Sequence, residues 1–245
     1  MPKNSRPPRQ LADAIGFKPH YHGHRQRLQE RLLEGGTESL PDYEILEILL
    51  AASNPRGDTK PLAKKLIDDL GGSLADVLSA DPEAIRRVAA DGRGLGNAGI
   101  AMLKAVREAG LRLSRAEISR RDVIGAWDKL IDYCTANIAH GKVEEFHLLF
   151  LDRKNALLKH ERQGRGTVDH TPVYTREVVK RALELGASAL ILVHNHPSGD
   201  PTPSKADIQV TRDIISAGKP LGLTVHDHLI IGRGGHTSLR DLGLL

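Results

Sequence analysis

The sequence predicts a two-part protein in which an α/β domain follows an all-α region. Between Arg25 and about residue 115, apolar residues recur at helical spacing and several segments stop at glycine pairs. From about residue 124 to residue 245, short apolar runs alternate with amphipathic segments, a pattern typical of strands and helices in one sheet. The charged segment between the two parts, residues 116–123, has no apolar stripe and is predicted to be a linker.

The hydrophobic pattern gives the expected elements in order. In the helical domain, residues 25–115, we expect helices over residues 23–36, 40–53 and 59–72, and two more within residues 81–113. In the α/β domain, residues 124–245, we expect helices over residues 124–138, 175–187 and 205–222. Short apolar runs predict strands at residues 146–152, 156–162, 188–194 and 223–232.

Composition excludes several classes of protein. Of the 245 residues, 40% are hydrophobic and 27% are charged, which is ordinary for a globular protein with a packed core. The sequence has no run of about 18 apolar residues and no signal-peptide pattern, so we expect a cytoplasmic protein without a membrane partner. The single cysteine, Cys134, excludes a disulfide framework and a multi-cysteine metal site, and it is expected in the core.

Residues 1–24 are predicted to form a disordered basic arm. The first 30 residues hold six basic and two acidic side chains, so their net charge of +4 equals that of the whole chain. Such an arm can contact DNA or another acidic surface, or it can be a solvated tail, and the sequence leaves both interpretations open.

The stretch LILVHNHPSGDPTPSKAD carries the most specific chemistry in the sequence. Side chains at i and i+2 of an extended segment share a face, so His194 and His196 point one way and Asn195 the other. Ser204 begins a helix, and Asp207 takes the N3 position in its first turn. Two imidazoles and a carboxylate can converge on one tetrahedral ion, and three protein ligands leave the fourth position for water, as in catalytic zinc sites.

Part of this motif has a simpler structural interpretation. Ser204 and Asp207 resemble a capping box, although the usual N3 partner is Glu or Gln. Capping does not account for two histidines on the same face beside it. A zinc deaminase would need a Pro-Cys-x-x-Cys partner and a helical zinc protease would need His-Glu-x-x-His, and the sequence has neither. The complete spacing, His-x-His-x(7)-Ser-x(2)-Asp, therefore predicts a hydrolytic metal site.

A hydrolytic site also needs a general base that takes a proton from water. Two acids, Glu144 and Glu145, stand immediately before the strand expected at residues 146–152, and either could project towards the metal. Both could equally be solvated charges at the edge of a strand. The pattern by itself does not choose between them.

These residues resemble two related families. A glutamate before a strand, followed by His-x-His-x(7)-Ser-x(2)-Asp, resembles the JAMM (MPN-type) zinc metalloproteases. More closely, HNHPSGDPTPSKADIQVT, HDHLIIG and EEFHLLFLD look like the RadC family, historically labelled DNA repair proteins. GHRQRLQERLLEGG and SLPDYEILEILL are similar to the RadC N-terminal region, so the resemblance covers nearly the whole chain.

The resemblance implies a fold, a cofactor and a set of roles. It implies one zinc ion per chain bound by His194, His196 and Asp207, with Glu144 as the acid/base and Ser204 steadying the oxyanion of a tetrahedral intermediate. It implies a mixed sheet flanked by helices, as in cytidine-deaminase-like folds. The implied activity is that of a peptidase or isopeptidase with a peptide or protein substrate. One position departs from the family, since residue 175 is threonine where proline is usual.

In the helical domain, GRGLGNAGIAMLKAV resembles a helix-hairpin-helix turn with Gly94, Leu95 and Gly96 at its centre. Such turns offer backbone N–H groups to DNA phosphates, so the alternative function is that of a nucleic-acid-associated protein. Gly99 stands where the family usually has lysine, which removes a phosphate-binding charge. A tight turn between packed helices accounts for the glycines equally well.

The last expected strand contains His226, Asp227 and His228. The two histidines would share a face and could mimic a second metal site. A buried hydrogen bond between histidine and aspartate is the simpler interpretation.

Overall fold

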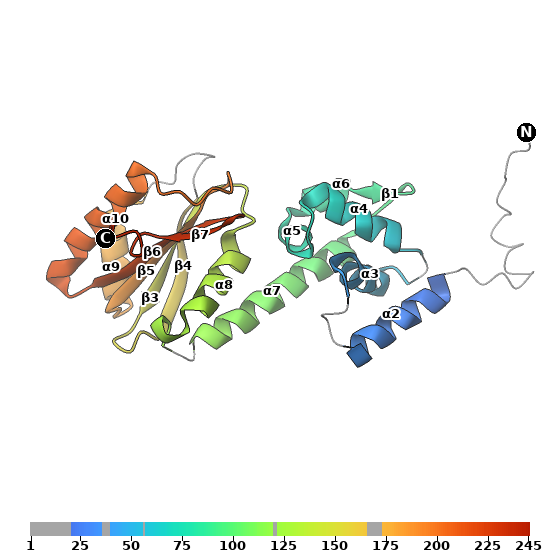
Figure 1. The fold of residues 1–245 in the computed structure, drawn as a ribbon, viewed down its shortest axis with the longest axis horizontal. Helices are drawn as coiled ribbons and strands as arrows, with labels where there is room; N and C mark the ends of the chain where they lie inside the picture. The colour runs from blue at the N-terminus through green and yellow to red at the C-terminus, as the bar shows by residue number, and fades with distance from the viewer. Residues whose placement is uncertain (1–20, 36–39, 56, 120–121, 166–172) are drawn as a thin grey trace, which may run out of the picture. The chain divides into compact units, whose positions relative to one another are not determined.

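The computed structural model describes residues 21–35, 40–55, 57–119, 122–165 and 173–245 (Figure 1). The chain divides into two compact units, Met1–Lys104 and Ala105–Leu245. Most of the predicted basic arm lies outside the described residues, but residues 21–24 begin a helix, so the predicted boundary at residue 24 was too late. Among the described helices, none combines the length and apolar character that a membrane span requires.

The first unit is helical, as predicted. Its elements are α2 (Tyr21–Gly35), α3 (Asp42–Ser53), α4 (Lys60–Leu70), α5 (Leu74–Ser79), α6 (Pro82–Arg87), the short strands β1 (Ala89–Ala90) and β2 (Arg93–Gly94), and the first part of α7 (Asn97–Ser119). Leucines of α3 and α4 pack with residues of the later elements in one core. The sequence reasoning missed α5, because a helix of six residues is too short to show a periodic pattern.

The predicted helix-hairpin-helix turn forms a small β-hairpin between α6 and α7. Gly94 pairs with Ala89 in that hairpin, Leu95 is buried, and the carbonyl of Gly96 accepts a hydrogen bond from the N–H of Ile100 in the first turn of α7. A side chain at Gly99 would collide with Leu95. The position that usually carries lysine is therefore used for packing in this chain.

The predicted linker was wrong for residues 116–119, which continue α7. Ile118 in this stretch is fully buried, and Val123 just after it is buried in the same core. The sequence pattern did not predict this part of the helix, because most of its side chains are solvated. One buried apolar residue is too few to form an apolar stripe along the helix. The division between the two compact units falls inside α7 rather than at the linker.

The second unit is an α/β sandwich. It contains η2 (Ile124–Ala126), α8 (Trp127–Ile138), β3 (Glu145–Leu151), β4 (Leu157–Arg165), α9 (Thr175–Glu184), β5 (Ala189–Asn195), α10 (Lys205–Gly218), η3 (Lys219–Leu221), β6 (Thr224–Gly232) and β7 (Gly235–Ser238). Every strand and helix that the hydrophobic pattern predicted in this part is present. The short strand β7 was missed, since GHTS has no apolar alternation.

The five strands form one mixed sheet in the order β4-β3-β5-β6-β7, with β5 and β6 parallel and the other pairs antiparallel. Helix α8 covers one face of the sheet, and α9 and α10 cover the other (Figure 1). Alternate residues of β3 show the two faces, because Phe146 packs on the α9–α10 side whereas Leu149 packs on the α8 side. The fold class predicted from the sequence is confirmed.

Candidate metal centre

Strand β5 positions the two histidines of the predicted site. His194 is 1% exposed and its ring stacks on Phe146, with 6.1 Å between the ring centroids, so it lies on the α9–α10 face. Asn195 points to the other face, where its amide group donates to the carbonyl groups of Gly141 and Val143. The N–H of His196 donates to the carbonyl of Ile231 on β6 at 2.9 Å, which keeps this residue extended after β5 ends.

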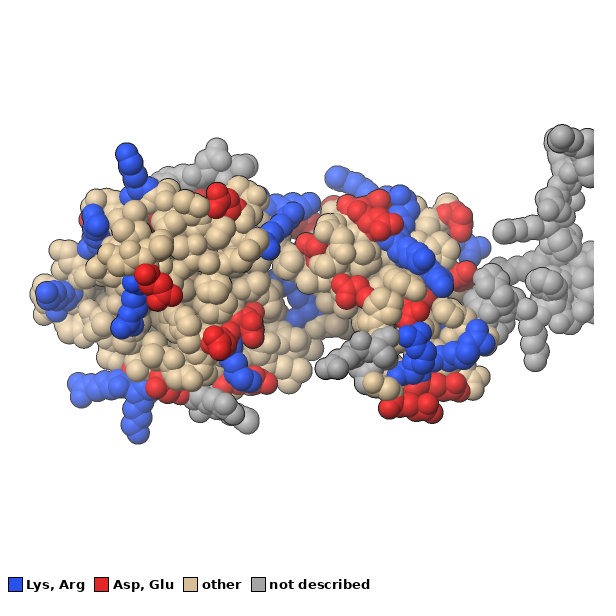
Figure 2. All heavy atoms as spheres, in the orientation of Figure 1, with Lys and Arg blue, Asp and Glu red and all other residues tan. Residues whose placement is uncertain are grey.

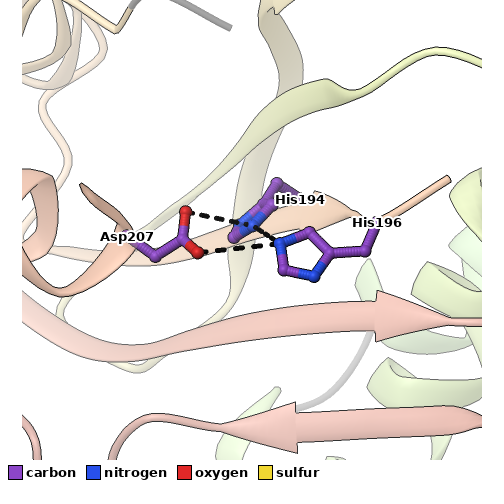
Figure 3. A group of neighbouring side chains, drawn as sticks. All are labelled: His194, His196 and Asp207. Atoms are coloured by element: carbon purple, nitrogen blue, oxygen red, sulfur yellow. Dashed lines mark hydrogen bonds and ion pairs between the residues drawn. The ribbon is translucent and has the colours of Figure 1, made fainter. Parts of the chain in front are cut away.

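The start of α10 holds the carboxylate of Asp207 against these histidines. The Asp207 N–H donates to Ser204 Oγ at 3.1 Å, and the Ser204 N–H donates to Asp207 Oδ2 at 2.7 Å, which completes a capping box. Asp207 Oδ1 lies 3.3 Å from His194 Nε2, and Asp207 Oδ2 lies 3.6 Å from His196 Nε2 (Figure 3). The carboxylate that completes the capping box is therefore also the one that lies against the two histidines.

Ligand atoms from the three residues all lie within 4.8 Å of one another, and Figure 3 shows both imidazoles and the carboxylate pointing to one place. Within the described part of the chain, this is the one cluster of His, Cys, Asp or Glu with the spacing of a metal site. The side chains of His196 and Asp207 remain 18% and 15% exposed, whereas that of His194 is buried. The cluster is thus closed on the protein side and open towards solvent.

Hydrogen bonds behind the cluster fix which nitrogen of each histidine carries a lone pair. The hydroxyl of Thr211 donates to the carbonyl of Asp207 at 2.5 Å, so its oxygen accepts from His228 Nδ1 at 2.6 Å. His228 is fully buried, and burial lowers its pKa well below the usual value, so its Nε2 is an acceptor. His194 Nδ1 lies 2.8 Å from that atom and must donate, which leaves the lone pair of His194 on Nε2.

A hydrogen bond likewise fixes the tautomer of His196. Its Nδ1 donates to the carbonyl oxygen of Asp200 at 2.8 Å, so its lone pair also lies on Nε2. The Nε2 atoms of His194 and His196 are 2.9 Å apart and two lone pairs cannot form a hydrogen bond. A cation placed between these atoms and the carboxylate removes the repulsion. One carboxylate oxygen and two imidazole nitrogens are also a ligand set that zinc commonly takes.

Electrostatics favour the protonation states that a metal needs. Burial lowers the pKa of His194 to about 4, so this imidazole is neutral near pH 7. Burial alone would raise the pKa of Asp207, but its contact with the imidazoles of His196 and His194 and its hydrogen bonds with Ser204 lower it well below its usual value. Contact with the Asp207 carboxylate raises the pKa of His196, against the opposing effect of burial. A neutral imidazole beside an ionised carboxylate matches the needs of a divalent ion.

The structure places the two candidate bases differently. The side chain of Glu145 lies 3.3 Å from His147 and 2.9 Å from Arg162, on the α8 side of the sheet. Glu144 is half-buried, and its charge helps to raise the pKa of His196. Of the two acids, Glu144 is therefore the one whose charge acts on the cluster.

The sequence reasoning missed the role of His228. A β-bulge at residue 226 shifts the pairing of β5 with β6, so the two histidines of this strand have different partners. His226 bonds Asn155, whereas His228 supports His194. Neither a second metal site nor a side-chain bond between histidine and aspartate is present at these described residues. Asp227 instead accepts from the hydroxyl of Ser238 and from backbone N–H groups, including that of its neighbour His228.

Cys134 lies in the core on α8, as expected, and burial raises the pKa of its thiol to about 12. The thiol is therefore protonated near neutral pH and has no part in the metal centre.

Comparison with known families agrees with this geometry. The family model described as the RadC-like JAB domain matches residues 124–244, which span the sheet, its three helices and all three clustered side chains. The matched residues contain both the mixed sheet and the His-His-Asp cluster. The chain belongs to the RadC family, with an MPN/JAB-type domain over its C-terminal half.

Proposed function

We propose that the JAB domain is a zinc-dependent hydrolase that cleaves peptide or isopeptide bonds. The observation that carries this proposal is the pair of inward lone pairs on His194 and His196, set beside the ionised carboxylate of Asp207 and open to solvent on one side. A structural metal site would be closed by a fourth protein ligand, and the described residues offer three. When bound there, zinc would lower the pKa of water and polarise a carbonyl group.

Each of the other residues has a separate task in this proposal. Glu144 takes the proton of the attacking water and delivers it to the leaving amine, as a general base and then a general acid. Ser204 uses its hydroxyl oxygen to cap α10 through the N–H of Asp207, which leaves its O–H proton to donate to the developing oxyanion. His228 holds His194 in the tautomer with Nε2 towards the ion.

Metal content and turnover separate these roles. We expect about one zinc ion per chain in protein purified without a histidine tag, and its loss when His194→Ala and His196→Ala are combined. Glu144→Gln should keep zinc, while cleavage in a peptide mixture followed by mass spectrometry falls by about 10²–10⁴-fold. Asp207→Asn should lower both zinc content and cleavage.

Glu145→Gln is the matched control, since its side chain lies on the other face of the sheet. Full activity in both glutamate variants would contradict the assigned mechanism. Activity lost in Glu145→Gln alone would assign the general base to Glu145 instead of Glu144. Zinc that stays well below one per chain after reconstitution would exclude the metal site.

We propose DNA binding by the first unit as a second function. Arg87 and Arg93 are exposed beside the hairpin that contains Gly94, and a phosphate could contact backbone N–H groups at the start of α7. On the face seen in Figure 2, however, Lys and Arg are interspersed with Asp and Glu rather than gathered in one patch. Together with the packing role of Gly99, this ranks DNA binding below hydrolysis.

Salt dependence tests this second function. If backbone phosphates are the ligand, affinity should not depend on DNA sequence and should fall steeply as salt rises. Removal of residues 1–27 should weaken it. Absence of binding near 50 mM salt, or binding insensitive to salt, would exclude it.

A further inference from the structure

A polar cavity lies in the JAB unit, away from the candidate metal centre. Its volume is about 250 Å³, and it is lined by Glu108, Leu111, Arg112, Arg115, Tyr133, Asn137, His147, His160 and Arg162. The first four of these residues lie on the second half of α7, and Tyr133 and Asn137 lie on α8. His194 packs against Phe146 on the opposite face of the sheet, so this cavity is separate from the site of hydrolysis.

The floor of the cavity is a chain of hydrogen bonds between buried and half-buried groups. Tyr133 Oη lies 2.6 Å from His160 Nδ1, and His160 Nε2 lies 3.0 Å from His147 Nδ1. The other nitrogen of His147 lies 3.3 Å from a carboxylate oxygen of Glu145. Burial lowers the pKa of His160 to about 3, so its ring is neutral near pH 7. The floor is polar and prearranged, but the positive charge of the cavity comes from its rim.

The rim carries three guanidinium groups. Arg112 Nε donates to Glu108 at 2.8 Å, and Arg162 Nη1 donates to Glu145 at 2.9 Å, so each of these arginines has one carboxylate partner. Arg115 has no ion pair or hydrogen bond among the described residues. Burial raises the pKa of Tyr133 and lowers that of His160, and the charge of Arg115 adds a lowering effect on both. Its positive charge therefore acts on the cavity, where the acid of the lining, Glu108, is paired with Arg112.

These features select an anion with several oxygens. A guanidinium group has five N–H donors, so Arg112 and Arg162 keep donors beyond those that their glutamates occupy. A monocarboxylate would balance Arg115 and use two oxygens. A phosphate monoester has three terminal oxygens and a charge between −1.5 and −2 near pH 7, so it can bind Arg115 and also accept from its neighbours. The volume is below the range of about 300–1,000 Å³ that drug-sized ligands occupy, which limits the ligand to a small molecule.

We propose that this cavity binds a small phosphate monoester, with Arg115 as its principal contact. The site is independent of the metal centre, and phosphate binding does not rest on hydrolytic activity.

Calorimetric titration of the full-length protein tests the assignment. The probes are glucose 6-phosphate, glucuronate and glucose, which share a sugar and differ in the charged group. We expect glucose 6-phosphate to bind at least tenfold more tightly than glucuronate, and glucose not to bind detectably. Tighter binding of glucuronate would overturn the phosphate assignment, and no binding of glucose 6-phosphate up to 10 mM would overturn the site.

Variants locate the binding. Arg115→Gln should weaken binding of glucose 6-phosphate at least tenfold, and Arg115→Lys should weaken it less because the charge remains. Arg176→Gln, on α9 with an 88% exposed side chain, is the matched control for a general loss of charge and should bind as the wild type does. An equal loss in Arg115→Gln and Arg176→Gln would show non-specific attraction and overturn the proposal.

Phosphate can also bind zinc, so the titration is repeated after treatment with a chelator and in the variant that combines His194→Ala with His196→Ala. Unchanged affinity supports a separate site. Loss of affinity in both, with circular dichroism unchanged, would place the phosphate at the metal centre and overturn the proposal.

Discussion

Single residues behind the His-His-Asp cluster determine the protonation of its side chains. His228 is fully buried between His194 and Thr211, and its hydrogen bonds leave one arrangement of protons on the chain of three residues. In metal sites, such a partner orients the ligand and raises its basicity. An exposed histidine could not hold one tautomer in this way, because water would satisfy either ring nitrogen.

Replacement of His228 by leucine should therefore weaken zinc binding although all three ligands remain. The expected loss in zinc affinity is about 10–100-fold, the usual effect of removing the hydrogen-bond partner of a metal ligand. Competition with a chromophoric chelator measures it. His236→Leu, at an exposed position on β7, is the control. Equal affinities in the wild type and His228→Leu would show that His194 does not need this partner.

The lowered pKa of His160 should make the free energy of unfolding depend on pH. Its pKa in the folded protein is about 3, below the value near 6.5 in the unfolded chain, because burial penalises the charged form. Its contribution is complete above about pH 6.5 and is lost as the pH falls towards 3. Across that window His160→Gln should reduce the slope of unfolding free energy against pH by up to about 1.4 kcal/mol per pH unit. Urea titrations between pH 3.5 and 7.5 measure this, and parallel curves would contradict it.

At the scale of elements, a strand end and a helix start bring the three clustered side chains together. His194 lies at the end of strand β5, and Asp207 lies in the capping box at the start of α10. The loop between them is packed against the end of β6, where a side chain at Gly232 would collide with the carbonyl of Gly199. This contact holds the loop that supplies the Asp200 carbonyl to His196.

Gly232→Ala should therefore displace the loop. We expect a loss in stability of about 1–3 kcal/mol, typical of overpacking, together with weaker zinc binding. Gly234→Ala is the matched control, because its added carbon would lie 3.7 Å from the same Gly199 carbonyl, an ordinary contact. Thermal unfolding and zinc titration follow the two effects. If Gly232→Ala has the thermal stability and the zinc affinity of the wild type, the loop can move away from the added carbon without loss of free energy.

At the scale of the whole molecule, the chain divides into two units at a point within the sequence of α7. The sequence puts the start of the second domain at residue 124, but Ile118 and Val123 are fully buried in its core. The second unit therefore needs part of a helix that looks like a charged linker. This difference gives a direct test of the boundary.

We expect the fragment 105–245 to fold and to bind zinc with the affinity of the full-length protein. The fragment 124–245 lacks the buried side chains of Ile118 and Val123, each of which contributes about 1.5–3 kcal/mol. Its unfolding free energy in urea should be lower by about 3 kcal/mol or more. Equal stabilities of the two fragments would support the boundary at residue 124.

Local patterns in the sequence were enough to predict the fold class and the three clustered side chains. His194 and His196 follow from the period of two in a strand, and Ser204 and Asp207 follow from the signature of a helix start. Both signals lie within a few residues of the side chains that they place. Apolar periodicity likewise predicted the main helices and strands, because it reports burial of one face.

The tertiary structure decided what depends on contacts between distant segments. Pairing of β3 with β5 puts Glu145 on the α8 face, and a bulge in β6 turns His228 towards His194. The cavity at Arg115 needs α7, α8 and two strands together. No local pattern encodes these contacts, because strand register, bulges and helix packing are fixed by the free energy of the whole core rather than by neighbouring residues.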